Sequence, residues 1–231
     1  MPVKQIRILH ASDLHIENGS PEARPQRALQ ALVGLAASCR ADLIIFCGDL
    51  FDNNRVSRET VAQVLSSLST TSVPVLILPG NHDCLIADSV YRQITELPPG
   101  IRLFTEQDGE QFVLSHLDLT VWGKSIMSYS GDQRPMAGVP ARAGTRWNIA
   151  MAHGYYTGAK SNGRYSLAIS QEEIIRSRMD YVALGHDSLF RCVCSDPVMA
   201  CYCGSASQPG TAAVVDIDES GVTVRCHRLF K

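Results

Sequence analysis

Carboxylate, amide and imidazole side chains follow five separate apolar stretches in this sequence, each at the point where a strand of that length would end. The clearest is Asp49, which follows the stretch 42–47 and Gly48, a residue type that adopts backbone angles other residues avoid. A Gly-Asp pair alone is also typical of an ordinary turn. The other four stretches end in comparable groups: Asp13 with His15, Asn81 with His82 and Asp83, His153, and His186.

Five such groups predict a metal centre. Ligands of open α/β sheets bind beyond the carboxyl ends of the strands, so acidic and imidazole side chains there are candidate metal ligands. Oxygen and imidazole donors together suit Mn, Fe or Zn. We therefore expect the five groups on one side of one sheet, where Asp49 could bridge two cations about 3.5–4 Å apart. For His82 and Asp83 the alternative is a turn stabilised by side-chain hydrogen bonds.

Alternating strands and helices must position the first three groups. Helical spacing of apolar residues predicts helices over about 27–38 and 58–69, the first after a loop that contains Pro25 and the second with Ser57 as its N-cap. With the apolar stretches between them, the order is β-α-β-α-β. That order is typical of a parallel sheet with right-handed crossovers.

The rest of the chain predicts a second sheet. Residues 112–115 and 119–122 have the pattern of a hairpin, and Ser170 is placed to begin a helix with Glu172 and Glu173 in its first turn. Three further patterns suit antiparallel strands: a cysteine-containing hairpin, residues 212–217, and residues 222–226. A second sheet built from these elements would bury its apolar face against the first. The predicted fold class is α/β, with two packed mixed β-sheets flanked by helices.

The motifs together resemble the ordered motif set of the calcineurin-like metallophosphoesterases. They are Asp13-x-His15, Gly48-Asp49, Gly80-Asn81-His82-Asp83, His153-Gly154 and Gly185-His186. Further stretches resemble the SbcD-like DNA repair exonucleases within that superfamily: 12–15, 48–52, 202–205 and 214–217. The resemblance implies an αββα sandwich. The SbcD-like nucleases usually continue into a capping domain, so we expect residues 1–231 to form a single metallophosphoesterase domain without that cap.

The resemblance also implies roles for individual residues. Two divalent metal ions, Mn in first place with Fe or Zn as alternatives, would be bridged by Asp49. Asp13 and His15 would hold the first metal, and Asn81, His153 and His186 would hold the second. His82 would donate a proton or stabilise charge near the leaving oxygen, with Asp83 orienting its ring. The implied function is a phosphodiesterase or DNA exonuclease-like hydrolase that uses a water activated by the two metals.

One position departs from the family pattern. The last family motif is Gly-His-x-His, whose second histidine completes the first metal's ligands, whereas this chain has Gly185-His186-Asp187-Ser188. A serine hydroxyl is a poor replacement for an imidazole. The first metal would then bind loosely, take Asp187 as a ligand, or accept a water. Two other functions stay open: a phosphomonoesterase or nucleotide pyrophosphatase acting on a small molecule, and a family member that binds nucleic acid or protein with weakened catalysis.

Charge and length limit the partners. A net charge of −2 excludes a uniformly basic surface for nucleic acid, but residues 124–164 carry six basic residues against one acid, Asp132. Within this segment Arg142 and Arg146 are predicted to bind substrate phosphate, and a solvated loop is the alternative. No apolar run approaches the ~18 residues needed to cross a bilayer, so we expect a cytoplasmic protein that does not bind membranes. The substrate would be a phosphodiester, DNA or a nucleotide, and no protein partner is indicated.

The cysteines and the remaining histidines carry weaker signals. Eight cysteines in a chain with no leader suit a reducing compartment better than a disulfide scaffold. Two Cys-x-Cys pairs predict a hairpin whose four thiols either pack in the core or converge on a structural zinc: Cys192, Cys194, Cys201 and Cys203. Three histidines match no motif, and we expect His10 behind the site and the other two, His116 and His227, on the surface.

Overall fold

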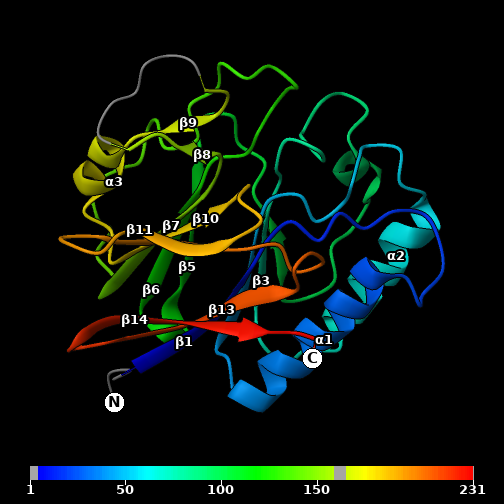
Figure 1. Cartoon of the computed structure of the whole chain (residues 1–231), viewed down its shortest axis with the longest axis horizontal. Helices are drawn as coiled ribbons and strands as arrows, with labels where there is room; N and C mark the ends of the chain where they lie inside the picture. The colour runs from blue at the N-terminus through cyan, green and yellow to red at the C-terminus, as the bar shows by residue number, and fades with distance from the viewer. Residues whose placement is uncertain (1–4, 159–164, 231) are drawn as a thin grey trace.

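Two six-stranded sheets pack face to face in the computed structural model, which describes residues 5–158 and 165–230 (Figure 1). The first sheet has the strand order β14 (Gly221–Arg228), β13 (Thr211–Asp218), β1 (Gln5–Ala11), β2 (Leu43–Cys47), β3 (Val75–Leu78), β4 (Ile101–Leu103). The second has the order β11 (Phe190–Cys194), β12 (Met199–Cys203), β10 (Tyr181–Gly185), β7 (Trp147–His153), β6 (Leu119–Gly123), β5 (Glu110–Leu114). Both sheets are mixed, as the sequence predicts.

Helices cover the outer face of each sheet. In Figure 1, α1 (Arg24–Cys39) and α2 (Arg58–Ser69) lie side by side against the first sheet, and α3 (Gln171–Ser177) lies by the second. A two-stranded ribbon of β8 (Tyr155–Tyr156) and β9 (Ala168–Ile169) lies near α3. Two short 3₁₀ helices, Val90–Gln93 and Ser115–Leu117, complete the described elements.

Alternation along the buried strands builds the two largest cores of the described residues. In β2, Ile44 and Phe46 pack toward α1 and α2, whereas Leu43, Ile45 and Cys47 pack between the sheets. A third core lies between the second sheet and α3 and includes Ile174 and Val182. Since β2 is buried on both faces, its sequence is continuously apolar, and this favours a central parallel strand.

The predicted helices form, with one shifted start. The second helix spans 58–69, and the side chain of Ser57 accepts a hydrogen bond from the main-chain N–H of Thr60, as its predicted N-cap role requires. The third begins after Ser170 with a capping box. The first helix begins at Arg24 rather than near residue 27, because Pro25 lies in its first turn instead of in the preceding loop. Proline is tolerated there, since the first helical N–H groups have no partner inside the helix.

The assignment of strands to sheets needs a correction. We expected all five ligand-bearing strands in one sheet, but β1, β2 and β3 belong to the first sheet and β7 and β10 to the second. The C-terminal strands also divide: β13 pairs antiparallel with β1 and extends the first sheet, while the cysteine hairpin extends the second. Local alternation indicates that a segment is a strand but not which edge it joins.

The cysteine hairpin forms, but its thiols do not converge. A register shift between Cys192 and Cys194 places Cys194 in the core near α3, whereas Cys201 and Cys203 pack between the sheets. The zinc alternative is therefore wrong, whereas the alternative of packing in the core is confirmed for Cys194, Cys201 and Cys203. Cys192 and Cys201 are directly opposite and joined by a disulfide, so the expectation of free thiols is also wrong for this pair, while the other six cysteines are free.

The three unassigned histidines lie as expected. His116 and His227 are exposed. His10 is fully buried between the sheets with Nδ1 2.9 Å from the hydroxyl oxygen of Tyr181, and burial lowers its pKa to about 3. Among the described residues, no helix is long and apolar enough to cross a membrane.

Candidate metal centre

The carboxyl ends of β1, β2, β3, β7 and β10 meet at one end of the two packed sheets and bring the predicted ligands together. Four non-glycine residues at these strand ends have positive φ, which is uncommon and costs of order 1–3 kcal/mol per residue. They are Asp13 (53°), His15 (52°), Asp49 (52°) and His186 (100°). All four are predicted metal ligands, and strained backbone of this kind clusters at functional sites.

Main-chain contacts between neighbouring strand ends hold these conformations. The N–H of Asp13 donates to the oxygen of Gly48 at 3.1 Å, and the N–H of His15 donates to the oxygen of Asp49 at 3.0 Å. Two glycines permit the close approach. A Cβ on Gly48 would lie 2.0 Å from Nδ1 of His153, and one on Gly80 would lie 2.2 Å from Oδ1 of Asp49. The glycines of the motifs therefore make room for the ligand side chains themselves.

The first of two overlapping groups gathers Asp49, Asn81, His153 and His186. Nε2 of His153 lies 2.9 Å from Oδ1 of Asn81 and 3.2 Å from Oδ2 of Asp49. Nδ1 of His186 lies 3.0 Å from the same Asn81 oxygen and 3.3 Å from Nε2 of His153. His153 is fully buried, and the side chain of Asp49 is 2% exposed. This set matches the predicted ligands of the second metal.

The chemistry of this group fits a bound cation. Nδ1–H of His153 donates to the oxygen of Cys47 at 2.8 Å, so Nε2 of the neutral ring presents a lone pair toward Asp49 and Asn81. Neither the ionised carboxylate nor the amide oxygen can donate a hydrogen bond. Three acceptor atoms this close need a positive charge among them, either a proton on His153 or a metal ion. A divalent cation would interact favourably with all of them at once.

The pKa values agree with that requirement. Burial lowers the pKa of His153, but the Asp49 and Asp13 carboxylates outweigh it and raise the pKa to about 10. Burial and the nearby charge of His153 lower the pKa of His186 to about 4. Burial raises the pKa of Asp49, but the His153 imidazolium outweighs burial and lowers that pKa overall. Without a metal the site keeps a proton on His153, and a bound cation would take over its role.

The second group contains Asp13, His15 and Asp49. Nε2 of His15 lies 3.9 Å from Oδ1 of Asp13 and 4.0 Å from Oδ2 of Asp49, and one ligand atom from each residue lies within 4.8 Å of the others. Oδ2 of Asp49 thus faces both groups, as a bridging carboxylate requires. Oδ2 of Asp13 accepts hydrogen bonds from the hydroxyl of Ser12 and from the N–H of His186. Burial raises the pKa of Asp13.

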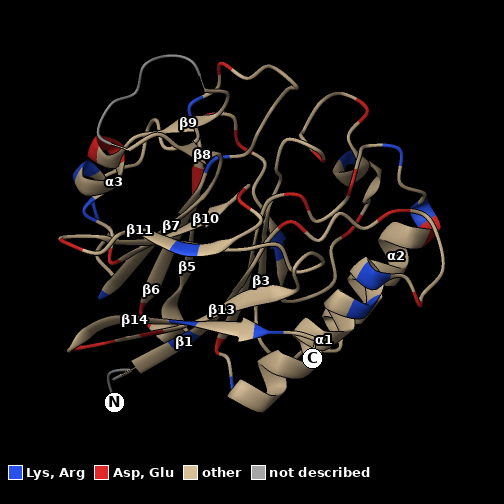
Figure 2. Cartoon of the chain, in the orientation of Figure 1, with Lys and Arg blue, Asp and Glu red and all other residues tan. Residues whose placement is uncertain are grey.

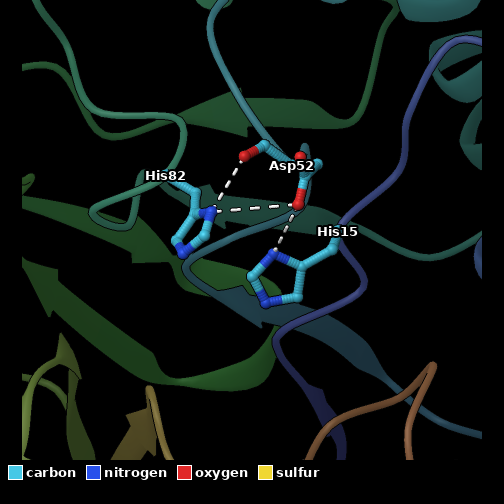
Figure 3. A group of neighbouring side chains, drawn as sticks. All are labelled: His15, Asp52 and His82. Carbon is cyan, nitrogen blue, oxygen red and sulfur yellow. Dashed lines mark hydrogen bonds and ion pairs between the residues drawn. The ribbon is translucent and has the colours of Figure 1, made fainter.

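Figure 3 shows a third group, which the sequence motifs did not single out: His15, Asp52 and His82. Oδ1 of Asp52 lies 3.4 Å from Nδ1 of His15 and 3.8 Å from Nδ1 of His82. The main-chain oxygen of Asp52 lies 2.9 Å from the same His82 atom (Figure 3). A carboxylate hydrogen-bonded to a ligand histidine fixes its tautomer. Among the described residues, Nδ1 of His15 makes no hydrogen bond, so Asp52 acts on that ring through its charge. The sequence feature that could have identified Asp52 is its position three residues after Asp49 in the same motif.

The side chain of Asp83 contacts different groups from those predicted. We expected it to orient the ring of His82, but its fully buried carboxylate accepts hydrogen bonds from the N–H of Gly80 at 2.7 Å, from the N–H of Phe51 at 3.0 Å and from the hydroxyl of Tyr91 at 2.6 Å. Burial and the charge of Asp49 raise its pKa to about 6. Asp83 therefore fixes the main chain around the site, and Asp52 contacts the ring.

The region around Ser188 is where the family pattern predicts a further ligand for the first site. Asp187 forms an ion pair with Arg191, with its Oδ2 2.6 Å from Nη2, and its Oδ1 accepts from the N–H of Leu189 at 3.0 Å. Its carboxylate is thus engaged on the β11 side, and Ser188 is exposed. Among the described residues, the group at the predicted first site contains Asp13, His15 and Asp49 and no fourth His, Cys, Asp or Glu.

Arg142 and Arg146 lie at the other end of the second sheet. Both precede Trp147, the first residue of β7, whereas His153 is the last, about 20 Å away at ~3.3 Å per residue. Arg142 pairs with Asp180 at 2.8 Å, and Arg146 pairs with Glu219 at 2.7 Å. The structure does not bring these arginines to the metal centre. Two other basic residues of the predicted segment, Lys160 and Arg164, lie outside the described residues.

Comparison with known proteins identifies related chains. The family model for calcineurin-like phosphoesterases matches residues 6–188. The Bacillus subtilis protein YhaO, an uncharacterized metallophosphoesterase, is 25% identical over 202 residues, which are 78% of this chain and 48% of YhaO. One component of the Escherichia coli nuclease SbcCD is 32% identical over 96 residues, 38% of this chain and 24% of that protein. The matched segments thus span about half or less of these relatives.

The fold also has solved counterparts. A Thermus thermophilus protein of known crystal structure superposes with a TM-score of 0.65 and 15% identity, covering 99% of this chain and 100% of its own. At that identity the likeness concerns the fold alone. It agrees with the αββα sandwich of two mixed sheets flanked by helices.

Proposed function

The chain belongs to the calcineurin-like phosphoesterase family, and we propose that it is a metal-dependent phosphodiesterase acting on nucleotides or nucleic acid strands. The observation that carries the proposal is the convergence of Asp49, Asn81, His153 and His186, with acceptor atoms 2.9–3.3 Å apart, beside Asp13 and His15. The partial match to a component of a nuclease supports the choice of phosphodiesters.

We further propose how this chain would hold two divalent cations. Asp13 and His15 would contribute to the first site, Asn81, His153 and His186 to the second, and Asp49 to both. This mixture of carboxylate, amide and imidazole donors favours Mn, with Fe or Zn as alternatives. The second site has more protein ligands than the first, so the second would bind its metal more tightly. When bound, the two metals would supply Lewis-acid activation of water and of the phosphate.

His82 is the proposed proton donor to the leaving oxygen. Its side chain is 45% exposed, so substrate can reach the ring. Its Nδ1–H faces the main-chain oxygen of Asp52 at 2.9 Å, which leaves Nε2 directed away from that contact. In the imidazolium form, Nε2–H would protonate the leaving alkoxide while Nδ1–H stays on Asp52. Asp52 would hold the ring in place through both its main chain and its carboxylate.

The distribution of surface charge favours a substrate that contacts the protein through only a few phosphates. In Figure 2 the basic residues are spread over several elements, among them α2, α3 and β14, and form no continuous stripe in that view. With a net charge of −2, affinity for a nucleic acid strand would come from a few phosphates near the metal centre. This favours cleavage at strand ends or in short nucleotides over tight binding along a duplex.

A substrate panel with added Mn²⁺ tests the proposal. We expect the purified chain to hydrolyse bis-p-nitrophenyl phosphate and short single-stranded DNA, and to hydrolyse p-nitrophenyl phosphate more slowly. A clear preference for the monoester would favour a phosphomonoesterase instead. Binding of DNA without turnover of any ester would favour the family member with weakened catalysis, for which Ser188 is the supporting residue.

A further inference from the structure

A cavity of about 490 Å³ lies next to the proposed catalytic centre, lined by Asp52, Asn53, Asn54, Arg55, Asn81, His82 and Tyr129. Its volume lies within the ~300–1,000 Å³ typical of small-molecule sites. Asn81 and His82 form the wall it shares with the metal centre. The cavity therefore begins where the scissile phosphate would lie and extends beyond His82.

Tyr129 offers an open aromatic surface in this cavity. The residue is 64% exposed, which makes it the most exposed large hydrophobic side chain among the described residues. Its hydroxyl oxygen nevertheless accepts a hydrogen bond from Nδ2 of Asn54 at 3.1 Å. Asn54 is itself buried, with Oδ1 accepting from the N–H of Val90 at 2.9 Å and Nδ2 donating to the oxygen of Cys84 at 3.0 Å. The ring is thus tethered at its tip while its surface stays accessible.

Such a ring suits the stacking of a nucleobase. Stacking of a base on an aromatic ring strengthens binding and tolerates any base, because each base has a π face. A tethered ring loses little conformational freedom when a base packs on it.

Arg55 supplies a positive charge on the same cavity. Its main-chain N–H donates to Oδ1 of Asn53 at 2.8 Å, and its main-chain oxygen accepts from Nδ2 of Asn18 at 3.4 Å, so the loop is held on both sides. The guanidinium group itself makes no ion pair or hydrogen bond with the residues that the structure describes, and Arg55 is exposed. A free guanidinium beside a phosphoesterase centre can bind a phosphate with two parallel hydrogen bonds.

We propose that this cavity binds the leaving nucleotide of the substrate, with the base on Tyr129 and the next phosphate on Arg55. The inference rests on the proposed function for the direction of cleavage, since His82 faces the leaving oxygen and the cavity lies on that side. It narrows the substrate class to phosphodiesters whose leaving group carries a base and a further phosphate. Ester substrates without a base would use the metal centre alone.

A binding experiment tests the cavity without requiring turnover. Titration of thymidine 3′,5′-bisphosphate into the metal-loaded protein, followed by calorimetry, should show tighter binding than inorganic phosphate. Tyr129→Ala and Arg55→Ala should each weaken binding of the bisphosphate about tenfold and leave that of inorganic phosphate within about twofold. Tyr129→Phe keeps the ring and should retain most of the affinity. Arg58→Ala removes an exposed arginine that does not line the cavity, and should change nothing.

The outcomes separate the cavity from the catalytic proposal. If the bisphosphate binds no more tightly than phosphate, or if Tyr129→Ala and Arg55→Ala bind it as the wild type does, the cavity is not a nucleotide site. If binding follows the expected pattern but no phosphodiester is hydrolysed, the cavity assignment stands and the proposed function fails. Hydrolysis of a 3′-phosphorylated thymidine dinucleotide that falls in Tyr129→Ala, with unchanged hydrolysis of bis-p-nitrophenyl phosphate, which carries no base, would support both.

Discussion

Nδ1 of His82 lies 2.9 Å from the main-chain oxygen of Asp52 and 3.8 Å from its Oδ1. The same Oδ1 lies 3.4 Å from Nδ1 of His15. One carboxylate therefore stands behind both the proposed proton donor and a proposed metal ligand. Asp52 begins the loop that follows Asp49, so the bridging residue and the residue that positions the two rings belong to one turn after β2.

Asp52→Asn tests the positioning role. The amide keeps the size and the main-chain contact but removes the negative charge that faces both rings. We expect kcat to fall about 10-fold or more, in line with the usual loss when a partner of a metal-binding histidine is removed. The melting temperature should stay nearly constant because Asp52 is partly exposed. Asp88→Asn, an exposed acid elsewhere, is the control, and equal kcat values for both variants would contradict the role.

Replacement of Asp83, unlike that of Asp52, should lower the stability of the protein, because Asp83 stabilises the fold around the site. Asp83→Ala leaves the N–H groups of Gly80 and Phe51 and the hydroxyl of Tyr91 without their acceptor. We expect a loss of about 3 kcal/mol in the free energy of unfolding, measured in urea, since each buried unpaired donor costs about 1–3 kcal/mol. An unfolding curve that matches the wild type would show that water or another group replaces the carboxylate.

Much of the fold was accessible from local patterns. The period of apolar residues at 58–69, together with Ser57, predicted α2 with its observed bounds. The acidic, amide and imidazole residues at the ends of five strands predicted the ligands that the structure brings together. These features are local in sequence, so the sequence alone reveals them.

Features that depend on packing between distant segments were not accessible. Nothing local indicates that β13 pairs with β1 while the cysteine hairpin joins β10, so the ligand-bearing strands were assigned to one sheet instead of two. The bonds of Asp83 to Tyr91 and of Asn54 to Tyr129 cross between loops in the same way. Residue type identified candidates for chemistry, and three-dimensional contacts decided their roles.

Arg142 and Arg146 should matter more for stability than for turnover. Their ion pairs with Asp180 and Glu219 lie at the surface and are partly exposed, and such pairs contribute about 0–1 kcal/mol each. We expect the double variant Arg142→Ala, Arg146→Ala to lose roughly 1 kcal/mol of unfolding free energy and to keep kcat/KM for single-stranded DNA within about twofold. A tenfold loss of kcat/KM, with weaker salt dependence of DNA binding, would instead support the predicted contact with substrate phosphate.

The free energy of unfolding should fall at low pH as Asp216 becomes protonated. Its carboxylate accepts from Nε of Arg7 at 2.7 Å and from Nη2 of Arg225 at 2.5 Å. Burial raises the pKa of Asp216, but these two hydrogen bonds outweigh burial and lower the pKa below the ordinary value of 3.8. A lowered folded-state pKa stabilises the protein above the unfolded-state pKa, and this stabilisation is lost as the pH falls through the folded-state value.

The Asp216→Asn variant makes that dependence measurable. We expect it to be about 1–2 kcal/mol less stable than the wild type at pH 7, as for hydrogen bonds to charged groups that are partly exposed. Below about pH 4 the difference should shrink, because the wild-type carboxylate becomes protonated as well. Urea unfolding at pH 7 and pH 3 supplies the comparison. A difference that stays constant between the two pH values would show that ionisation of Asp216 is not its source.

The most direct measurement is a Mn²⁺ titration of wild type and Asp49→Asn, combined with the rate on bis-p-nitrophenyl phosphate. Oδ2 of Asp49 faces His15 at 4.0 Å and His153 at 3.2 Å, so a single charge serves both proposed sites. The wild type should bind two equivalents of Mn²⁺, one tightly at the second site and one less tightly at the first site. Asp49→Asn should keep its circular dichroism, bind at most one equivalent and lose at least about 100-fold in rate, because two metals contribute several kcal/mol to such reactions. Two equivalents and a rate within about tenfold of the wild type would contradict the dinuclear site bridged by Asp49.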